Sequence, residues 1–93
     1  MNDVLNLGVI GVGRWGPNIV RNFASMDGVF VKTVCDLDNK RLQIVQRRFP
    51  AITITQNPED IFSDPSISCV VICTPVSTHF ALAEKTLLSD KHV

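Results

Sequence analysis

Three closely spaced glycines constrain the fold of this chain more than any other feature. Gly11, Gly13 and Gly16 follow an apolar run over residues 4–10. Apolar residues then recur with helical spacing between positions 19 and 24. The pattern therefore predicts a buried strand, a tight glycine turn and a helix in direct succession.

The same alternation continues along the rest of the chain. Further strands are predicted at 29–35, 52–55 and 67–73, where β-branched and apolar residues are concentrated. A helix capped by Asp38 or Asn39 follows the second strand, and a short helix follows the third. In the last helix, capped by Ser77 or Thr78, the spacing predicts an inward face of Phe80, Ala83, Leu87 and Leu88.

Apolar strands that alternate with helices are typical of parallel sheets built from strand–helix–strand units. Because such crossovers are right-handed, the sequence predicts an α/β fold with a doubly wound, Rossmann-type parallel sheet in the order 3-2-1-4. Residues 92–93 read as the first residues of a fifth strand. We therefore expect residues 1–93 to be an incomplete N-terminal domain of a longer protein.

An acidic residue gives the glycine loop a chemical interpretation. Asp36 ends the predicted second strand, twenty residues after Gly16. A glycine loop between strand and helix, with an acid at that distance, is the dinucleotide-binding arrangement. Gly11 permits the turn, Gly13 lets the backbone approach a pyrophosphate, and Gly16 allows close helix–strand packing. The sequence therefore predicts a dinucleotide site.

Charged and aromatic residues around the loop refine this prediction. The backbone N–H groups near Arg14, Trp15 and Gly16 would point at the phosphates, where the helix dipole adds partial positive charge. Asp36 would accept hydrogen bonds from the adenosine ribose and repel a 2′-phosphate, which favours NAD. Arg41 could accommodate that phosphate or stack on adenine, so NADP stays open.

A second motif follows the predicted fourth strand. Thr74, Pro75 and His79 would lie at the carboxyl edge of the sheet, on the nicotinamide side of the same crevice. His79 falls in the first turn of a helix, whose dipole disfavours a cation. A neutral hydrogen-bonding role is therefore more plausible for it than acid–base chemistry.

Composition excludes several other functions. Nine basic and nine acidic residues give zero formal net charge, which argues against nucleic acid or an anionic membrane as a partner. No apolar run is long enough to span a bilayer, and no secretory signal begins the chain. Three cysteines and two histidines without metal-ligand spacing indicate reduced thiols, a cytoplasmic location and no metal site.

In both motifs, the chain resembles the N-terminal NAD(P)-binding part of the Gfo/Idh/MocA oxidoreductases. The run from Gly8 to Asn18 matches that family's opening, and Thr74, Pro75 and His79 match its Thr-Pro-x-x-x-His element. Val76 departs from the asparagine that many members carry, which puts a contact to the nicotinamide ribose in doubt.

The resemblance implies an NAD(P)-dependent dehydrogenase that acts on a sugar, nucleotide sugar or polyol. It implies that the family's catalytic lysine, within a Glu-Lys-Pro element, comes just after Val93. It also implies a C-terminal α/β domain that holds substrate and forms a homo-oligomer. On this interpretation residues 1–93 contain no catalytic residue and supply cofactor binding only.

Two other functions fit parts of the pattern. A non-catalytic dinucleotide-binding or sensing module would use the same glycine loop and acid. A fragment of an S-adenosylmethionine-dependent methyltransferase would also have a glycine loop and a ribose-binding acid. The third glycine and the Thr-Pro-x-x-x-His element favour the dinucleotide-binding interpretations.

Overall fold

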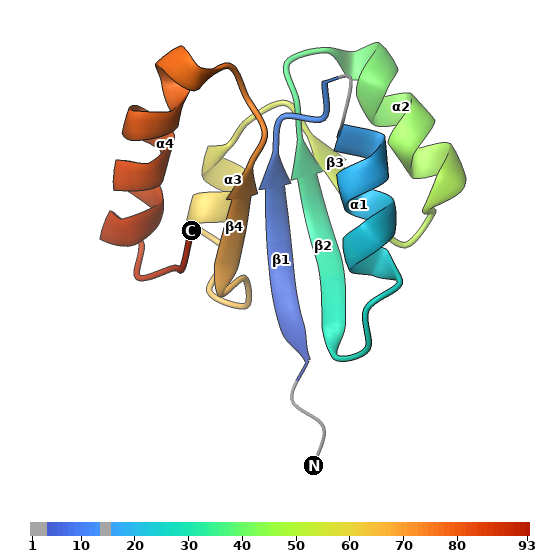
Figure 1. Cartoon of the computed structure of the whole chain (residues 1–93), viewed down its shortest axis with the longest axis horizontal. Coiled ribbons are helices and arrows are strands. Elements are labelled where there is room, and N and C mark those ends of the chain that lie inside the picture. The colour runs from blue at the N-terminus through green and yellow to red at the C-terminus, as the bar shows by residue number, and fades with distance from the viewer. Residues whose placement is uncertain (1–3, 14–15) are drawn as a thin grey trace.

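The fold is a four-stranded parallel sheet with helices on both faces, seen in a computed structural model that describes residues 4–13 and 16–93 (Figure 1). The strand order is β3-β2-β1-β4, as the sequence predicts. The strands are β1 (Leu5–Ile10), β2 (Val29–Cys35), β3 (Thr53–Thr55) and β4 (Cys69–Ile72). The helices are α1 (Gly16–Ala24), α2 (Asn39–Arg48), α3 (Glu59–Phe62) and α4 (Val76–Leu88).

Strand β1 lies at the centre of the sheet and aligns its neighbours. Ile10, the last residue of β1, pairs with Cys35 on β2 and with Ile72 on β4. The three strands therefore end at one edge, and the segments that follow them lie close together. His92 pairs with Cys69 in a parallel bridge, as predicted for the first residues of a fifth strand.

Two apolar clusters hold the helices to the sheet. Helices α1 and α2 pack on one face, and α3 and α4 lie on the other side (Figure 1). The first cluster comprises Val9, Val12, Val20, Val31, Val34, Leu42, Val45 and Ile52. The second comprises Ile10, Cys35, Ile61, Phe62, Ile67 and Val70. No helix in the described ranges has the length and apolarity needed to cross a membrane.

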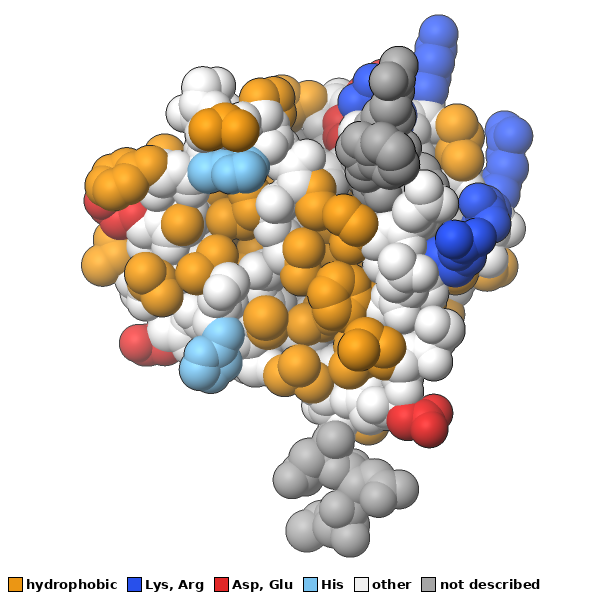
Figure 2. All heavy atoms as spheres, in the orientation of Figure 1, with side chains coloured by type: hydrophobic (Ala, Val, Ile, Leu, Met, Phe, Trp, Pro, Cys, Tyr) orange, Lys and Arg blue, Asp and Glu red, His pale blue; other side chains and the backbone are white. Residues whose placement is uncertain are grey.

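The helices leave part of the sheet open. Figure 2 shows apolar side chains gathered over the middle of the face where β1 and β4 lie. Leu5 is 40% exposed, and Cys69 and Val71 on β4 are only half-buried. Helices α1 and α2 thus cover the β2 and β3 side of this face more fully than the β4 side.

The predicted inward face of α4 is wrong. Phe80 is 79% exposed and Leu88 is 77% exposed, whereas Thr86 is fully buried. Leu82 packs against the second cluster. Thr86 tolerates burial because its hydroxyl donates to the carbonyl of Leu82 on its own helix, at 2.7 Å. The helix is therefore rotated relative to the apolar stripe in its sequence.

The capping predictions have mixed outcomes. Asp38 caps α2, since its carboxylate accepts from the backbone N–H of Lys40 at 2.9 Å. Neither Ser77 nor Thr78 caps α4, which begins earlier, with Pro75 at the cap position and no side-chain cap hydrogen bond.

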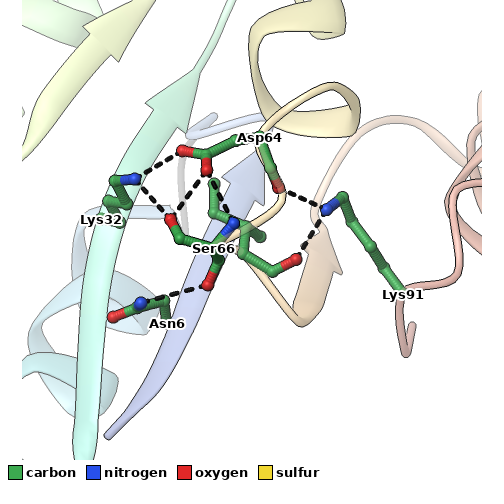
Figure 3. A network of polar contacts seen from close by, with 6 residues as sticks. Asn6, Lys32, Asp64, Ser66 and Lys91 are labelled. Carbon is green, nitrogen blue, oxygen red and sulfur yellow. Dashed lines mark hydrogen bonds and ion pairs between the residues drawn. The ribbon is translucent and has the colours of Figure 1, made fainter.

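A polar network joins the loop after α3 to β1, β2 and the end of the chain (Figure 3). The Lys32 ammonium lies 2.6 Å from the Asp64 carboxylate and also donates to the Ser66 hydroxyl. The Asn6 side chain donates to the Ser66 carbonyl. Lys91 is buried and donates to the carbonyls of Asp64 and Ile67, both at 2.6 Å. The loop is thereby fixed at the edge of the sheet opposite the glycine turn.

This network predicts an acid-sensitive contribution to stability. Hydrogen bonds from Lys32 and Ser66 lower the pKa of Asp64 from 3.8 to about 2. Because the folded-state pKa is the lower one, the stabilisation is complete above pH 4 and is lost between about pH 4 and pH 2. We expect Asp64→Asn to reduce the free energy of unfolding by about 1 kcal/mol at pH 7, since water partly screens the pair.

Thermal unfolding of the wild type and the variant between pH 7 and pH 2 would measure this effect. The gap between their melting temperatures should be about 5 °C at pH 7 and should close near pH 2. Asp27→Asn, at an exposed turn aspartate, is the matched control and should show no such gap. A gap for Asp64→Asn that stays constant with pH would contradict the ionic origin.

Candidate functional site

A cavity of about 620 Å³ lies at the carboxyl edge of the sheet. It is bounded by the glycine turn after β1, the end of β2, the turn after β4 and the first turns of α4. The lining residues are Ile10, Gly11, Gly13, Cys35, Asp36, Leu37, Arg41, Pro58, Cys73, Thr74, Pro75, Ser77, Thr78, Ala81 and Leu82. The cavity therefore brings both predicted motifs together.

Gly11 and Gly13 have different structural requirements. Both have positive φ, +88° and +45°, which favours glycine. A Cβ on Gly11 would lie 2.7 Å from the Thr74 methyl carbon and 2.9 Å from the Thr74 backbone nitrogen. Among the residues that the structure describes, a Cβ on Gly13 would meet the Arg41 guanidinium alone, at 3.9 Å. Gly11 thus permits contact with the β4 turn, whereas no described residue comes within 3.9 Å of a Cβ on Gly13.

Asp36 is linked to the glycine turn itself. One carboxylate oxygen accepts from the Val12 backbone N–H at 2.8 Å, and the other accepts from the Asp38 backbone N–H at 2.8 Å. Each carboxylate oxygen can accept more than one hydrogen bond, so acceptor capacity remains for a ligand. The half-buried carboxylate is held at the cavity wall with its orientation fixed.

Arg41 and Leu37 form the wall beyond Asp36. Arg41 is held by Asp38, with its Nε 3.6 Å from the carboxylate, and its guanidinium lies near Gly13. Leu37 lines the cavity and is 82% exposed. Sequence reasoning missed Leu37 because a single leucine in a turn belongs to no periodic pattern. Its apolar surface and the Arg41 guanidinium are both suited to contact a flat aromatic ring.

Thr74 and Pro75 form the opposite wall, as the sequence predicts for the turn after β4. The Thr74 hydroxyl lies 2.6 Å from the Thr78 hydroxyl, which also lies 2.7 Å from the Pro75 carbonyl oxygen. Thr78 was considered only as a helix cap in the sequence, yet it lines the cavity and contacts both residues of the turn.

His79 lies apart from the other predicted site residues. Its Nε2 is 2.5 Å from the Thr74 carbonyl oxygen, so the ring hydrogen-bonds to the backbone of the turn. It lines a second, smaller cavity of about 320 Å³ with Val70, Val71, Ile72, Ala83 and Val93, and it is not among the lining residues of the first. A direct contact between His79 and a ligand in the larger cavity stays a prediction.

Three predicted residues belong to the far end of the glycine turn. Arg14 and Trp15 lie outside the described residues. Gly16 is the first residue of α1.

The thiols near the cavity are in their neutral form at neutral pH. Burial, with the nearby charges of Asp36 and Asp60, raises the pKa of Cys35 to about 11. Burial also raises the pKa of Cys73. Both cysteines are free thiols. Among residues 4–13 and 16–93, no group of three or more His, Cys, Asp or Glu side chains is arranged to hold a metal ion.

These features together fit a dinucleotide. The described residues leave space at Gly13, the Asp36 carboxylate is fixed at the cavity wall, and the cavity continues to the Thr74–Pro75 turn. The fold and the site therefore define a dinucleotide-binding α/β domain.

Comparison with known proteins gives the family. Residues 5–93 match the model of the Gfo/Idh/MocA oxidoreductase family, described as having an NAD-binding Rossmann fold. The chain belongs to this family, as the resemblance in its two motifs predicts. The match favours the dinucleotide-binding interpretations over a methyltransferase fragment.

Curated relatives are considerably longer than this chain. A protein from Shewanella putrefaciens named "Glycosyl hydrolase family 109 protein" is 33% identical over 99 residues, which cover 97% of this chain and 22% of the relative. A myo-inositol 2-dehydrogenase from Thermotoga maritima is 26% identical over 89 residues, which cover 96% of this chain and 27% of the relative. The chain thus spans about a quarter of their lengths.

Solved structures share the fold. An oxidoreductase from Agrobacterium radiobacter, determined in complex with NAD+, L-tartaric acid and magnesium, superposes with a TM-score of 0.85 at 28% identity. The match covers 94% of this chain and 25% of that one.

The two glycines predict different costs of substitution. We expect Gly11→Ala to lower the free energy of unfolding by about 2–4 kcal/mol, because it combines an unfavourable φ with a clash against the Thr74 backbone. Gly13→Ala should cost only about 1–2 kcal/mol, since it combines the unfavourable φ with no clash against the described residues. Denaturant unfolding of both variants would measure the difference. Equal costs would contradict the close packing of Gly11 on the β4 turn.

Proposed function

We propose that this chain binds NAD in the larger cavity. The convergence of Gly13, Asp36 and Thr74 on one cavity is the observation that carries the proposal. Asp36 accepts hydrogen bonds from the adenosine ribose, and the turn at Gly11 and Gly13 receives the pyrophosphate. Thr74 and Pro75, on the other side of β1, face the nicotinamide half. The NAD-bound Agrobacterium oxidoreductase, with the same fold, supports this assignment.

Charge at the ribose position favours NAD over NADP. A 2′-phosphate beside Asp36 would meet a carboxylate whose two oxygens are already held in place by backbone N–H groups. Repulsion at about 4 Å costs roughly 1 kcal/mol in water and about 4 kcal/mol at an effective dielectric of 20. Arg41 offsets part of this repulsion, because its guanidinium lies on the same wall.

For the intact protein we propose an oxidoreductase that acts on a hydroxyl of a sugar, nucleotide sugar or polyol. Residues 1–93 would form its nucleotide-binding domain, and a further domain would bind substrate. Bound NAD would accept a hydride from the carbinol carbon at nicotinamide C4, while the hydroxyl proton passes to a base and a carbonyl forms. The relative named myo-inositol 2-dehydrogenase supports a polyol substrate. A homo-oligomer in the cytoplasm is part of this proposal.

A second candidate for the intact protein is glycoside cleavage. The Shewanella relative, 33% identical to this chain, is named as a glycosyl hydrolase. Supplying the full-length protein with NAD and either a free polyol or a glycoside would separate the two reactions. Accumulation of NADH supports the dehydrogenase, whereas release of free sugar without net NADH supports the hydrolase.

The cofactor assignment predicts a charge-dependent preference. Asp36→Asn should raise the affinity for NADPH relative to NADH by about tenfold, because the repulsive charge is removed while the shape is kept. Both ligands share any loss from altered hydrogen bonding to Val12 and Asp38, so the ratio reports the charge. Fluorescence titration of the reduced cofactors would measure it.

Asp27→Asn, at an exposed turn position remote from the cavity, should leave the ratio unchanged. Failure of the wild-type chain to bind either cofactor, with binding of S-adenosylmethionine instead, would overturn the proposal. Unchanged NADH and NADPH affinities in Asp36→Asn would remove Asp36 from the ribose site.

If a separate domain binds the substrate, residues 1–93 alone should have no dehydrogenase activity. We expect residues 1–93 to bind NAD+ yet reduce none of it when mixed with myo-inositol or a sugar, because the carboxylate at the cavity, Asp36, is assigned to the adenosine ribose and not to the substrate hydroxyl. The absorbance of reduced nicotinamide would measure turnover. Sustained reduction by the purified chain would contradict the prediction, and tight NAD+ binding without turnover by the full-length protein would favour a binding module.

A further inference from the structure

The outward face of α2 concentrates positive charge. Four of the nine basic residues of this chain are exposed on it, Lys40, Arg41, Arg47 and Arg48. No aspartate or glutamate occurs between residues 39 and 58. Figure 2 shows Lys and Arg side chains gathered on the side of the molecule where α2 lies in Figure 1. The surface is therefore locally basic, although the formal net charge of the chain is zero.

An apolar side chain lies at the centre of these charges. Ile44 is 51% exposed and belongs to neither apolar cluster. Lys40 and Arg41 precede it by four and three residues. Arg47 and Arg48 follow it by three and four residues. Because residues three and four apart are neighbours on a helix surface, the four cations surround Ile44, and we call these five residues the α2 surface.

Contacts within the chain neutralise only part of this charge. The Arg41 Nε lies 3.6 Å from the carboxylate of Asp38. Among residues 4–13 and 16–93, no carboxylate forms an ion pair with Lys40, Arg47 or Arg48. Four cations and one paired carboxylate leave three positive charges around Ile44. The α2 surface is thus complementary to an anionic partner.

The stability of the helix does not account for the arrangement. Arg47 and Arg48 lie in the last turn of α2, where the helix dipole favours cations. Lys40 and Arg41 lie in the first turn, where the dipole disfavours them and no acidic residue is present. Ile44 is a weaker helix former than alanine, and it leaves apolar surface in water. Helix stability alone therefore favours neither Ile44 nor the cations at the start of α2.

From this we propose that the α2 surface docks an acidic segment of another protein, which places an apolar side chain on Ile44 and carboxylates on the cations around it. An apolar centre with a polar rim is the usual anatomy of a protein–protein interface. Arginine suits the rim because its guanidinium can bind a carboxylate through two parallel hydrogen bonds. The proposal goes beyond cofactor binding and does not depend on it.

Two other anionic partners fit the α2 surface less well. Nucleic acid binds through its phosphates, which gain nothing from an apolar residue at the centre of the contact. An anionic membrane is bound by helices with a broad apolar face, whereas this surface presents a single isoleucine. The zero net charge of the chain adds no long-range attraction to either polyanion.

The helix sets the spacing of the charges that a partner must present. The two pairs of cations are seven residues apart, which is about 10 Å along the helix axis at about 1.5 Å per residue. A helical peptide with a central leucine, and with glutamates three and four positions to either side of it, has carboxylates at the same spacing. Such a peptide of about 15 residues, the length at which an isolated helix becomes marginally stable, is the probe.

Fluorescence anisotropy of the labelled peptide tests the proposal. We expect the peptide to bind the purified chain, with an affinity that falls as salt is added. Arg47→Gln and Ile44→Ala should each weaken peptide binding about threefold, through a lost ion pair and a lost apolar contact. Glutamine and alanine are good helix formers, so both variants should remain folded. Arg41 is left unchanged because it also lines the dinucleotide cavity.

Lys85→Gln is the matched control, since it removes one positive charge from α4, on the other side of the sheet (Figure 1). It should bind the peptide as the wild type does. An equal loss in Lys85→Gln and Arg47→Gln would show a response to net charge alone and would overturn the proposal. Absence of peptide binding to the wild type, or full affinity in Ile44→Ala, would overturn it as well. Tighter binding of phosphatidylserine vesicles or of single-stranded DNA than of the peptide, weakened by Arg47→Gln, would assign the surface to that partner instead.

Discussion

The pairing of β1 with a parallel strand on each side is the constraint on which the site depends. Because Ile10 is level with the last residues of β2 and β4, the glycine turn, Asp36 and Thr74 emerge at one edge of the sheet. The turn is then locked from both sides. The Val12 backbone N–H donates to Asp36, and Gly11 lies against the Thr74 backbone. A change in the register of β1 would separate all of these groups.

Sequence patterns predicted the sheet and the glycine turn well because both depend on local chemistry. Apolar strands separated by helices can form few topologies, and only glycine readily adopts the positive φ of Gly11 and Gly13. The strand order follows from these features, whereas the family prediction also needed the Thr-Pro-x-x-x-His element at Thr74, Pro75 and His79. Asp36 and Thr74 are far apart in the sequence, yet both line the cavity. Their proximity could be predicted because the predicted strand order places the ends of their strands at one edge of the sheet.

Which side chains line the cavity depends on tertiary contacts that the spacing of residues in the sequence does not predict. Leu37 lines the cavity because the turn after β2 exposes it, although a lone leucine carries no pattern. His79 belongs to the same motif as Thr74, yet its ring bonds to the backbone of the turn and lines the other cavity. A sequence motif identifies residues that lie close together along the chain, but it does not predict which of their side chains face the ligand.

The rotation of α4 shows the same limit in a helix. Its sequence contains two possible inward stripes, an apolar one through Phe80, Leu87 and Leu88 and a more polar one through His79 and Thr86. Hydrophobic spacing favours the first, but in the structure His79 hydrogen-bonds to the turn after β4 and Thr86 is buried. Thr86 can be buried because its own helix satisfies its hydroxyl. The phase of α4 therefore agrees with its contacts to the turn after β4 and to the second cluster, and not with the apolar stripe in its sequence.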